Sequence, residues 1–198
     1  MKKILTFSIT LSALPLSALA HVGGQPHTHG LAGSFAQGFV HPFTGLDHLA
    51  AMLAVGAWSA LAVRPAWRAP AAFVALLVLG ALAGFSGLWV PGVEPMIAAS
   101  VLVLGLLVAV HQRMPWGAAA GLAGVFAFFH GAAHGYELAG DGGAAAFGAL
   151  AGMAAGSAVL HVAGMLLGHA VMQRHQWIAR AGGAATALLG AFLLTRLA

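Results

Sequence analysis

The chain of 198 residues is 61% hydrophobic, and only 6% of its residues are Asp, Glu, Lys or Arg, against roughly 25% in soluble domains. A mean hydropathy of +0.93, 28 glycines and no cysteine exclude a disordered chain, a disulfide scaffold, a Cys-based metal site and a thiol nucleophile. The formal charge of +4 comes from dispersed cations and not from a basic stripe, so the composition predicts an integral protein of the lipid bilayer with no nucleic-acid partner.

The N-terminus has the features of a secretory signal. Lys2 and Lys3 precede an apolar run over residues 4–16, and an Ala-Leu-Ala end at 18–20 fits the cleavage rule. We predict a cleaved signal peptide at 1–20; the alternative is an uncleaved first membrane helix. Residues 21–30 form a His-bearing periplasmic tail in this interpretation. Its histidines are either an outer capture site for metal or part of a mobile tail: His21, His27 and His29.

Residues 31–198 form the predicted membrane domain. Turn residues and charges divide it into apolar segments whose lengths suit membrane helices of ~20 residues. These segments cover about 46–63, 70–90, 95–112, 116–139, 143–172 and 176–197. The fold class is therefore all-α, a polytopic bundle of six transmembrane helices.

Loop charge predicts the orientation of this bundle. Arginines occur in alternate connections and acidic residues in the others: Arg64, Arg68, Arg113 and Arg174 against Glu94 and Asp141. The positive-inside rule then places both ends of the mature chain outside, in a multi-pass protein of the bacterial inner membrane. Arg196, near the C-terminus, is the exception.

Ionisable residues at membrane depth are candidates for function because they are expensive to bury. One group lies in FHGAAHGYE at 129–137, where His130, His134 and Glu137 share one helix face. Imidazole suits nickel, cobalt, zinc and copper, and a carboxylate adds compensating charge. The alternative is that the three residues only support helix packing.

A second group lies in HPFTGLDH at 41–48. Pro42 and Gly45 predict a break between a short helical stretch ending near His41 and a full helix starting near Asp47. Asp47 then occupies a first helical turn, where it can cap the helix, bind metal or do both. His48 and Met52 follow on one face.

Topology puts both groups in the outer half of the membrane, where five or six ligands could meet if the first and fourth segments are neighbours. The fifth segment adds side chains at steps of four that could lead a metal inward or could simply fill the core, among them His161, Met165 and His169.

Through HPFTGLDH and FHGAAHGYE the chain resembles the HupE/UreJ family of hydrogenase and urease accessory membrane proteins. The resemblance implies a nickel or cobalt permease linked to maturation of those enzymes. It assigns metal handling to His41, Asp47, His48, His130, His134 and Glu137. The first motif also resembles the H-x4-D-H signature of a larger nickel/cobalt transporter family, although here five residues separate His41 from Asp47.

The sequence thus predicts a secondary permease that admits Ni²⁺, or next Co²⁺, from the periplasm to the cytoplasm. Metal is cargo, and no prosthetic group is expected. Both lysines lie in the signal, so the mature chain has no Walker-type loop for ATP. The competing hypotheses are an intramembrane zinc-dependent hydrolase and a metal-binding accessory subunit without transport.

Overall fold

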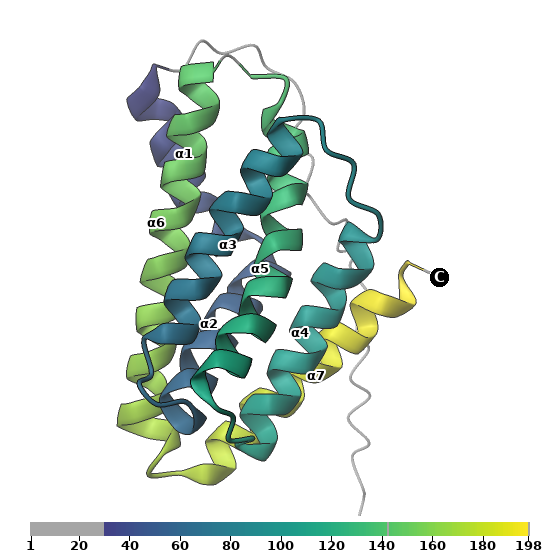
Figure 1. Ribbon diagram of the computed structural model, residues 1–198. Helices are drawn as coiled ribbons and strands as arrows, with labels where there is room; N and C mark the ends of the chain where they lie inside the picture. The colour runs from purple at the N-terminus through teal and green to yellow at the C-terminus, as the bar shows by residue number, and fades with distance from the viewer. Residues whose placement is uncertain (1–29, 142, 198) are drawn as a thin grey trace, which may run out of the picture.

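The computed structural model describes residues 30–141 and 143–197, and the regular elements in these ranges are all helical (Figure 1). They are α1 (Leu31–Thr44), α2 (Leu46–Ala62), α3 (Arg68–Phe85), α4 (Val93–Val110), α5 (Trp116–Leu138), α6 (Gly143–Leu167), the π-helical turn η1 (Gly168–Met172) and α7 (Gln176–Thr195). The all-α prediction is confirmed for this part of the chain. The predicted signal peptide at 1–20 and three tail histidines, His21, His27 and His29, lie outside the described residues.

Five helices are long and apolar enough to cross a membrane: α3, α4, α5, α6 with η1, and α7. Helices α1 and α2 pass the same test together, as a pair bent by 80°. Counting that pair as one broken span gives up to six. Five of them lie at predicted apolar segments, whereas the sixth adds residues 31–44 to the predicted segment 46–63. The orientation of the bundle in the bilayer stays a prediction.

The predicted break between α1 and α2 is confirmed and falls at Gly45. Pro42 stands in the last turn of α1, where its ring and missing N–H disfavour further helix. The helix nevertheless runs to Thr44, beyond the predicted end near His41. Gly45 has φ −85° and ψ 124°, so a positive φ is not its role. A Cβ there would lie 2.9 Å from Oδ1 of Asp47, so glycine is favoured at this position because a side chain would crowd that carboxylate.

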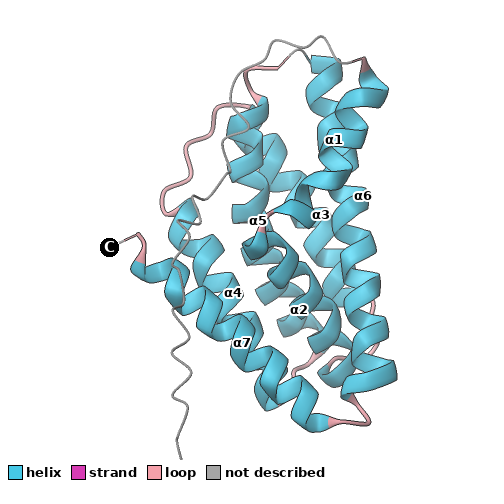
Figure 2. Ribbon diagram, turned by 180° about the vertical axis from the view of Figure 1, so that it is seen from behind, coloured by secondary structure: helices cyan, strands magenta, loops and turns pink. Residues whose placement is uncertain are grey.

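Both halves of the broken span pack on α6, which runs the length of the bundle (Figures 1 and 2). A Cβ added to Gly156 would meet the ring of Pro42, and one added to Gly164 would meet the backbone of Leu53 in α2. The break therefore lies beside the middle of α6.

The other helices also pair through glycine. A Cβ on Gly80 of α3 would collide with the backbone of Phe128 in α5, and one on Gly105 of α4 with that of Ala187 in α7. Such small residues let membrane helices approach closely. Gly121 of α5 is an exception, with nothing within 4 Å of an added Cβ.

Candidate metal centre

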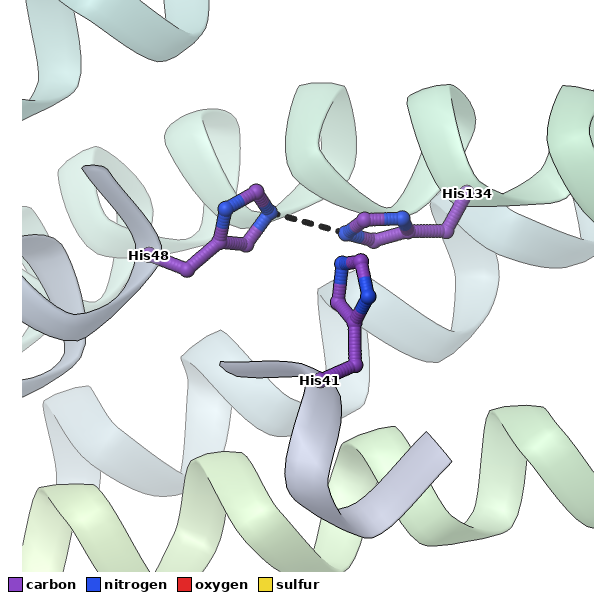
Figure 3. A group of neighbouring side chains, drawn as sticks. All are labelled: His41, His48 and His134. Carbon is purple, nitrogen blue, oxygen red and sulfur yellow. Dashed lines mark hydrogen bonds between the residues drawn. The ribbon is translucent and has the colours of Figure 1, made fainter. Parts of the chain in front are cut away.

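Three imidazoles from three helices meet beside the break between α1 and α2 (Figure 3). His41 comes from the last turn of α1, His48 from the first turn of α2, and His134 from the end of α5. One ligand nitrogen from each lies within 4.8 Å of the others. The centroid of the His41 ring is 4.7 Å from that of His134 and 5.4 Å from that of His48. The three side chains form a group that could hold a metal ion.

A carboxylate supports each of two rings in this group. Nδ1 of His48 lies 3.0 Å from Oδ1 of Asp47, and Nδ1 of His134 lies 3.1 Å from Oε2 of Glu137. The same oxygen of Asp47 accepts the backbone N–H of His48 at 2.9 Å, so Asp47 also stabilises the start of α2. In metal sites such carboxylates fix the orientation and tautomer of the ligating ring.

These two hydrogen bonds determine where the ring lone pairs point. An ionised carboxylate only accepts, so Nδ1 of His48 and of His134 are the donors. In a neutral ring the lone pair then belongs to Nε2. The two Nε2 atoms face each other at 2.8 Å, and two lone pairs at this distance require an extra proton or a cation between them. The arrangement suits a cation that is coordinated by both rings.

Exposure increases from the rings toward the carboxylates. The side chain of His134 is 6% exposed and that of His48 is 12%, while Asp47 reaches 32% and Glu137 53%. The centre is therefore buried on its imidazole side and open on its acidic side. A cation arriving from the surface would meet the negative charge before it meets the nitrogen ligands.

Comparison with known proteins identifies the family of this chain. Residues 9–193 match the family described as HupE / UreJ protein. The chain belongs to the HupE/UreJ family. It is 41% identical to Protein HupE of Rhizobium leguminosarum bv. viciae over 186 residues, which cover 93% of this chain and 95% of that relative. No solved structure matches.

In this HupE/UreJ chain His130 lies next to the three-histidine group without joining it. Its ring centroid is 5.3 Å from that of His48. Nδ1 donates to the carbonyl of Phe126 at 2.9 Å, one turn back in α5. Its Nε2 is buried and has no hydrogen-bond partner within the described residues. His130 thus presents a free lone pair one helical turn from His134.

The ring of Phe73 in α3 lies beside His130 and beside a further imidazole. The centroid of Phe73 is 5.8 Å from that of His130 and 5.0 Å from that of His161 in α6. His161 is 1% exposed, and neither of its ring nitrogens has a hydrogen-bond partner in the described part of the chain. Buried imidazoles without partners are uncommon, because each unsatisfied group costs about 1–3 kcal/mol.

Three further candidates for the inward path are Met52, Met165 and His169. Met52 is fully buried and belongs to the apolar core of α2. Met165 is half-buried in α6, and the exposed His169 receives a hydrogen bond from Nε2 of Gln173 at 3.0 Å. Among the described residues, no hydrogen bond, ion pair or ring contact joins these three residues to the centre.

The structure brings together the six residues that the motifs suggested, in three different relationships. His41, His48 and His134 form the group, Asp47 and Glu137 bond to two of its rings, and His130 borders it. Sequence reasoning missed Phe73. One phenylalanine in an apolar segment carries no signal that distinguishes it from ordinary core.

Proposed function

We propose that this chain is a secondary permease that carries a divalent transition metal, Ni²⁺ first and Co²⁺ next, from the periplasm to the cytoplasm across the bacterial inner membrane. The observation that carries the proposal is the convergence of His41, His48 and His134 at the break between α1 and α2, within a bundle whose described part has five helices of membrane-spanning length. The family resemblance implies nickel or cobalt transport and a link to hydrogenase or urease maturation. HupE/UreJ proteins are generally transporters, which favours a permease over a zinc hydrolase.

The chemistry of the centre fits a dication as cargo. Imidazole nitrogens suit Ni²⁺ and Co²⁺, whereas Mg²⁺ and Ca²⁺ prefer oxygen ligands. Asp47 and Glu137 supply two negative charges beside the rings, which offset the charge of the ion in a medium of low dielectric. This exposure gradient supports two successive steps. The carboxylates capture the ion first, and the buried rings then replace part of its hydration shell.

The inward route in this proposal passes His130 and His161. Both present buried ring nitrogens with no partner among the described residues, and each can replace a ligand that the ion leaves behind. The ring of Phe73 lies against both imidazoles, so an ion moving between them has to displace it. Phe73 is then the barrier that separates the metal centre from the inner half of the path.

The membrane potential is sufficient to drive such uptake without ATP. A dication moving inward through 100 mV gains about 4.6 kcal/mol, twice the ~2.3 kcal/mol of a single charge. Conduction also requires that the centre release its ion, so binding has to be moderate. Three imidazoles with no thiolate ligand are consistent with moderate binding.

The deciding experiment is metal uptake into proteoliposomes under an inside-negative potential, with Ni²⁺, Co²⁺ and Zn²⁺ offered separately. Wild type is compared with Asp47→Asn, His134→Ala and the control His175→Ala, which removes an exposed histidine in the connection between η1 and α7. We expect flux of Ni²⁺, with less flux of Co²⁺, that both site variants abolish and the control retains.

Other outcomes would replace the proposal. Metal binding without flux in wild type would indicate an accessory subunit. Stoichiometric zinc together with turnover of a lipid or peptide would indicate the hydrolase. Circular dichroism of each purified variant separates loss of the centre from loss of the fold.

A further inference from the structure

A cavity of about 420 Å³ lies at the opposite end of the bundle from the α5–α6 connection. It sits where α2 and α4 end and where η1 passes into α7, at the lower end of the ribbon in Figure 1. Side chains from four elements and three connections line it, so the cavity belongs to the packed fold and not to one loop. Its polar wall consists of Arg64, His111, Arg113, Gln173, Gln176 and Arg180.

The three guanidinium groups in this wall have no counter-charge from the described residues. The ion pairs within the described part of the chain are those of His48 with Asp47 and of His134 with Glu137, at the histidine centre. The other described acidic residues, Glu94 at the start of α4 and Asp141 after α5, lie at the far end of those helices. Converging positive charges repel one another, and an anion between them would relieve that repulsion.

Arg68, at the same end of the bundle, shows by contrast a guanidinium group that packs on aromatic rings. Arg68 lies over the ring of Trp116 at 4.3 Å and near that of Trp67 at 5.8 Å, a cation–π arrangement that ties the start of α3 to the start of α5. Arg64, Arg113 and Arg180 have no such aromatic partner among the described residues and line the cavity instead.

The cavity is amphipathic and lies at the level of an interface. Its apolar wall is made by Leu61, Val110 and the buried Met172. Trp67, Trp116 and Trp177 at the same end are 60%, 50% and 70% exposed. Exposed tryptophans collect at the depth of the lipid headgroups. A ligand with a charged head and an apolar continuation fits this position.

We propose that this cavity binds a phosphate ester anion, the chemistry shared by phospholipid headgroups and small organophosphates. Guanidinium groups bind phosphate through paired hydrogen bonds, and basic pockets between membrane helices accept anionic lipid heads. Two glutamines, Gln173 and Gln176, add neutral donors on the same wall. The inference does not rest on the transport proposal and stands or falls separately from it.

Positive charge near a membrane face does not by itself require a ligand, because topology alone favours arginine there. The chain offers a control for this alternative. Arg174 is exposed at the same end of the bundle but does not line the cavity. A diffuse attraction to anionic membranes would depend on Arg174 as much as on Arg113 or Arg180, whereas a site would not.

The experiment uses the full-length protein purified in a neutral detergent. Thermal unfolding and native mass spectrometry are followed while phosphatidylglycerol, phosphatidylcholine or sn-glycerol 3-phosphate is added. The variants are Arg113→Gln with Arg180→Gln, the charge-retaining Arg113→Lys with Arg180→Lys, and the control Arg174→Gln. Metal binding to each variant serves as an independent measure that the remainder of the fold is intact.

We expect phosphatidylglycerol to bind and stabilise wild type, the lysine pair and Arg174→Gln, and to bind the glutamine pair about thirtyfold more weakly, roughly fivefold for each guanidinium removed. Binding of phosphatidylglycerol alone assigns the site to a lipid head, and binding of glycerol phosphate as well assigns it to the phosphate group. Equal binding of phosphatidylcholine and phosphatidylglycerol, or equal loss in Arg174→Gln, would overturn the proposal.

Discussion

Nε2 of His48 and Nε2 of His134 lie 2.8 Å apart, although 86 residues separate them in the chain. Nδ1–H of each ring donates a hydrogen bond to a carboxylate from its own helix, so the Nε2 lone pairs of both rings face the same point. This contact joins α2 to α5 at the break in the first span. It is the feature of the molecule that most directly indicates a place for a cation.

Removing either supporting carboxylate should weaken metal binding without removing a ligand. In Glu137→Gln the amide oxygen can still accept from Nδ1 of His134, but it carries no negative charge and competes with the amide NH2 for the same place, and loss of such a carboxylate partner typically costs 10–100-fold in metal affinity. We expect that loss in Ni²⁺ titrations of the purified protein. Glu94→Gln, at the start of α4, is the control, and an equal loss there would mean that only general negative charge matters.

A side chain at Gly45 should disturb the centre from the backbone side. The Cβ of Gly45→Ala would stand 2.9 Å from Oδ1 of Asp47 and 3.1 Å from Nδ1 of His48. The carboxylate then has to move, and we expect weaker Ni²⁺ binding with α-helix content unchanged by circular dichroism. Gly30→Ala, with open space around the added atom, should bind as wild type does. Wild-type affinity in Gly45→Ala would contradict the assigned role of Asp47.

The sequence predicted the residues of the centre better than it predicted their roles. Polar groups at helical spacing in apolar segments located Asp47, His130, His134 and Glu137 without knowledge of the fold, because such groups are expensive in a membrane. Whether a carboxylate binds metal or orients a ring depends on distances of less than one residue step. Spacing along a helix does not contain that information.

Other features depend on contacts between distant helices. The packing of α1 and α2 on α6 depends on glycines of α6, such as Gly156 and Gly164, that approach particular atoms of α1 and α2. Other glycines of this chain stand in similar apolar sequence, so the sequence does not show which of them make such contacts. Phe73 of α3 matters because its ring lies beside those of both His130 and His161, which come from α5 and α6. The arginine-lined cavity likewise depends on distant parts of the chain, because it lies where α2, α4 and η1 end and α7 begins.

Helix packing gives a prediction about stability that is independent of metal. Gly131 and Gly121 both lie in α5, but a Cβ on Gly131 would collide with the backbone of Leu77 in α3, while Gly121 faces open space. We expect Gly131→Val to destabilise the protein by about 1–3 kcal/mol or more, as overpacking does. Gly121→Val should unfold close to wild type in a detergent thermal melt. Equal melting of both variants would contradict the close α3–α5 packing.

Uptake should decrease as the external pH is lowered. Metal and protons compete for the same ring lone pairs, and only the neutral imidazole is a ligand. We expect Ni²⁺ flux into proteoliposomes to be higher at about pH 8 than at about pH 5, with the potential held constant. Protein-free liposomes measured at both pH values control for leak. A flat profile would exclude histidine ligands at the step that limits uptake.

Replacing His161 should lower metal uptake without lowering the stability of the protein. Both of its ring nitrogens are buried without partners in the described structure, and an apolar side chain of similar size would remove that cost. His161→Leu is therefore expected to unfold at the same temperature as wild type or a higher one. It should keep Ni²⁺ affinity at the centre formed by His41, His48 and His134, because it touches none of them in the described contacts, and yet lower uptake at least tenfold. Undiminished uptake would exclude His161 from the path. Reduced affinity at the centre would instead indicate that the two sites are coupled through Phe73, whose ring lies 5.0 Å from that of His161.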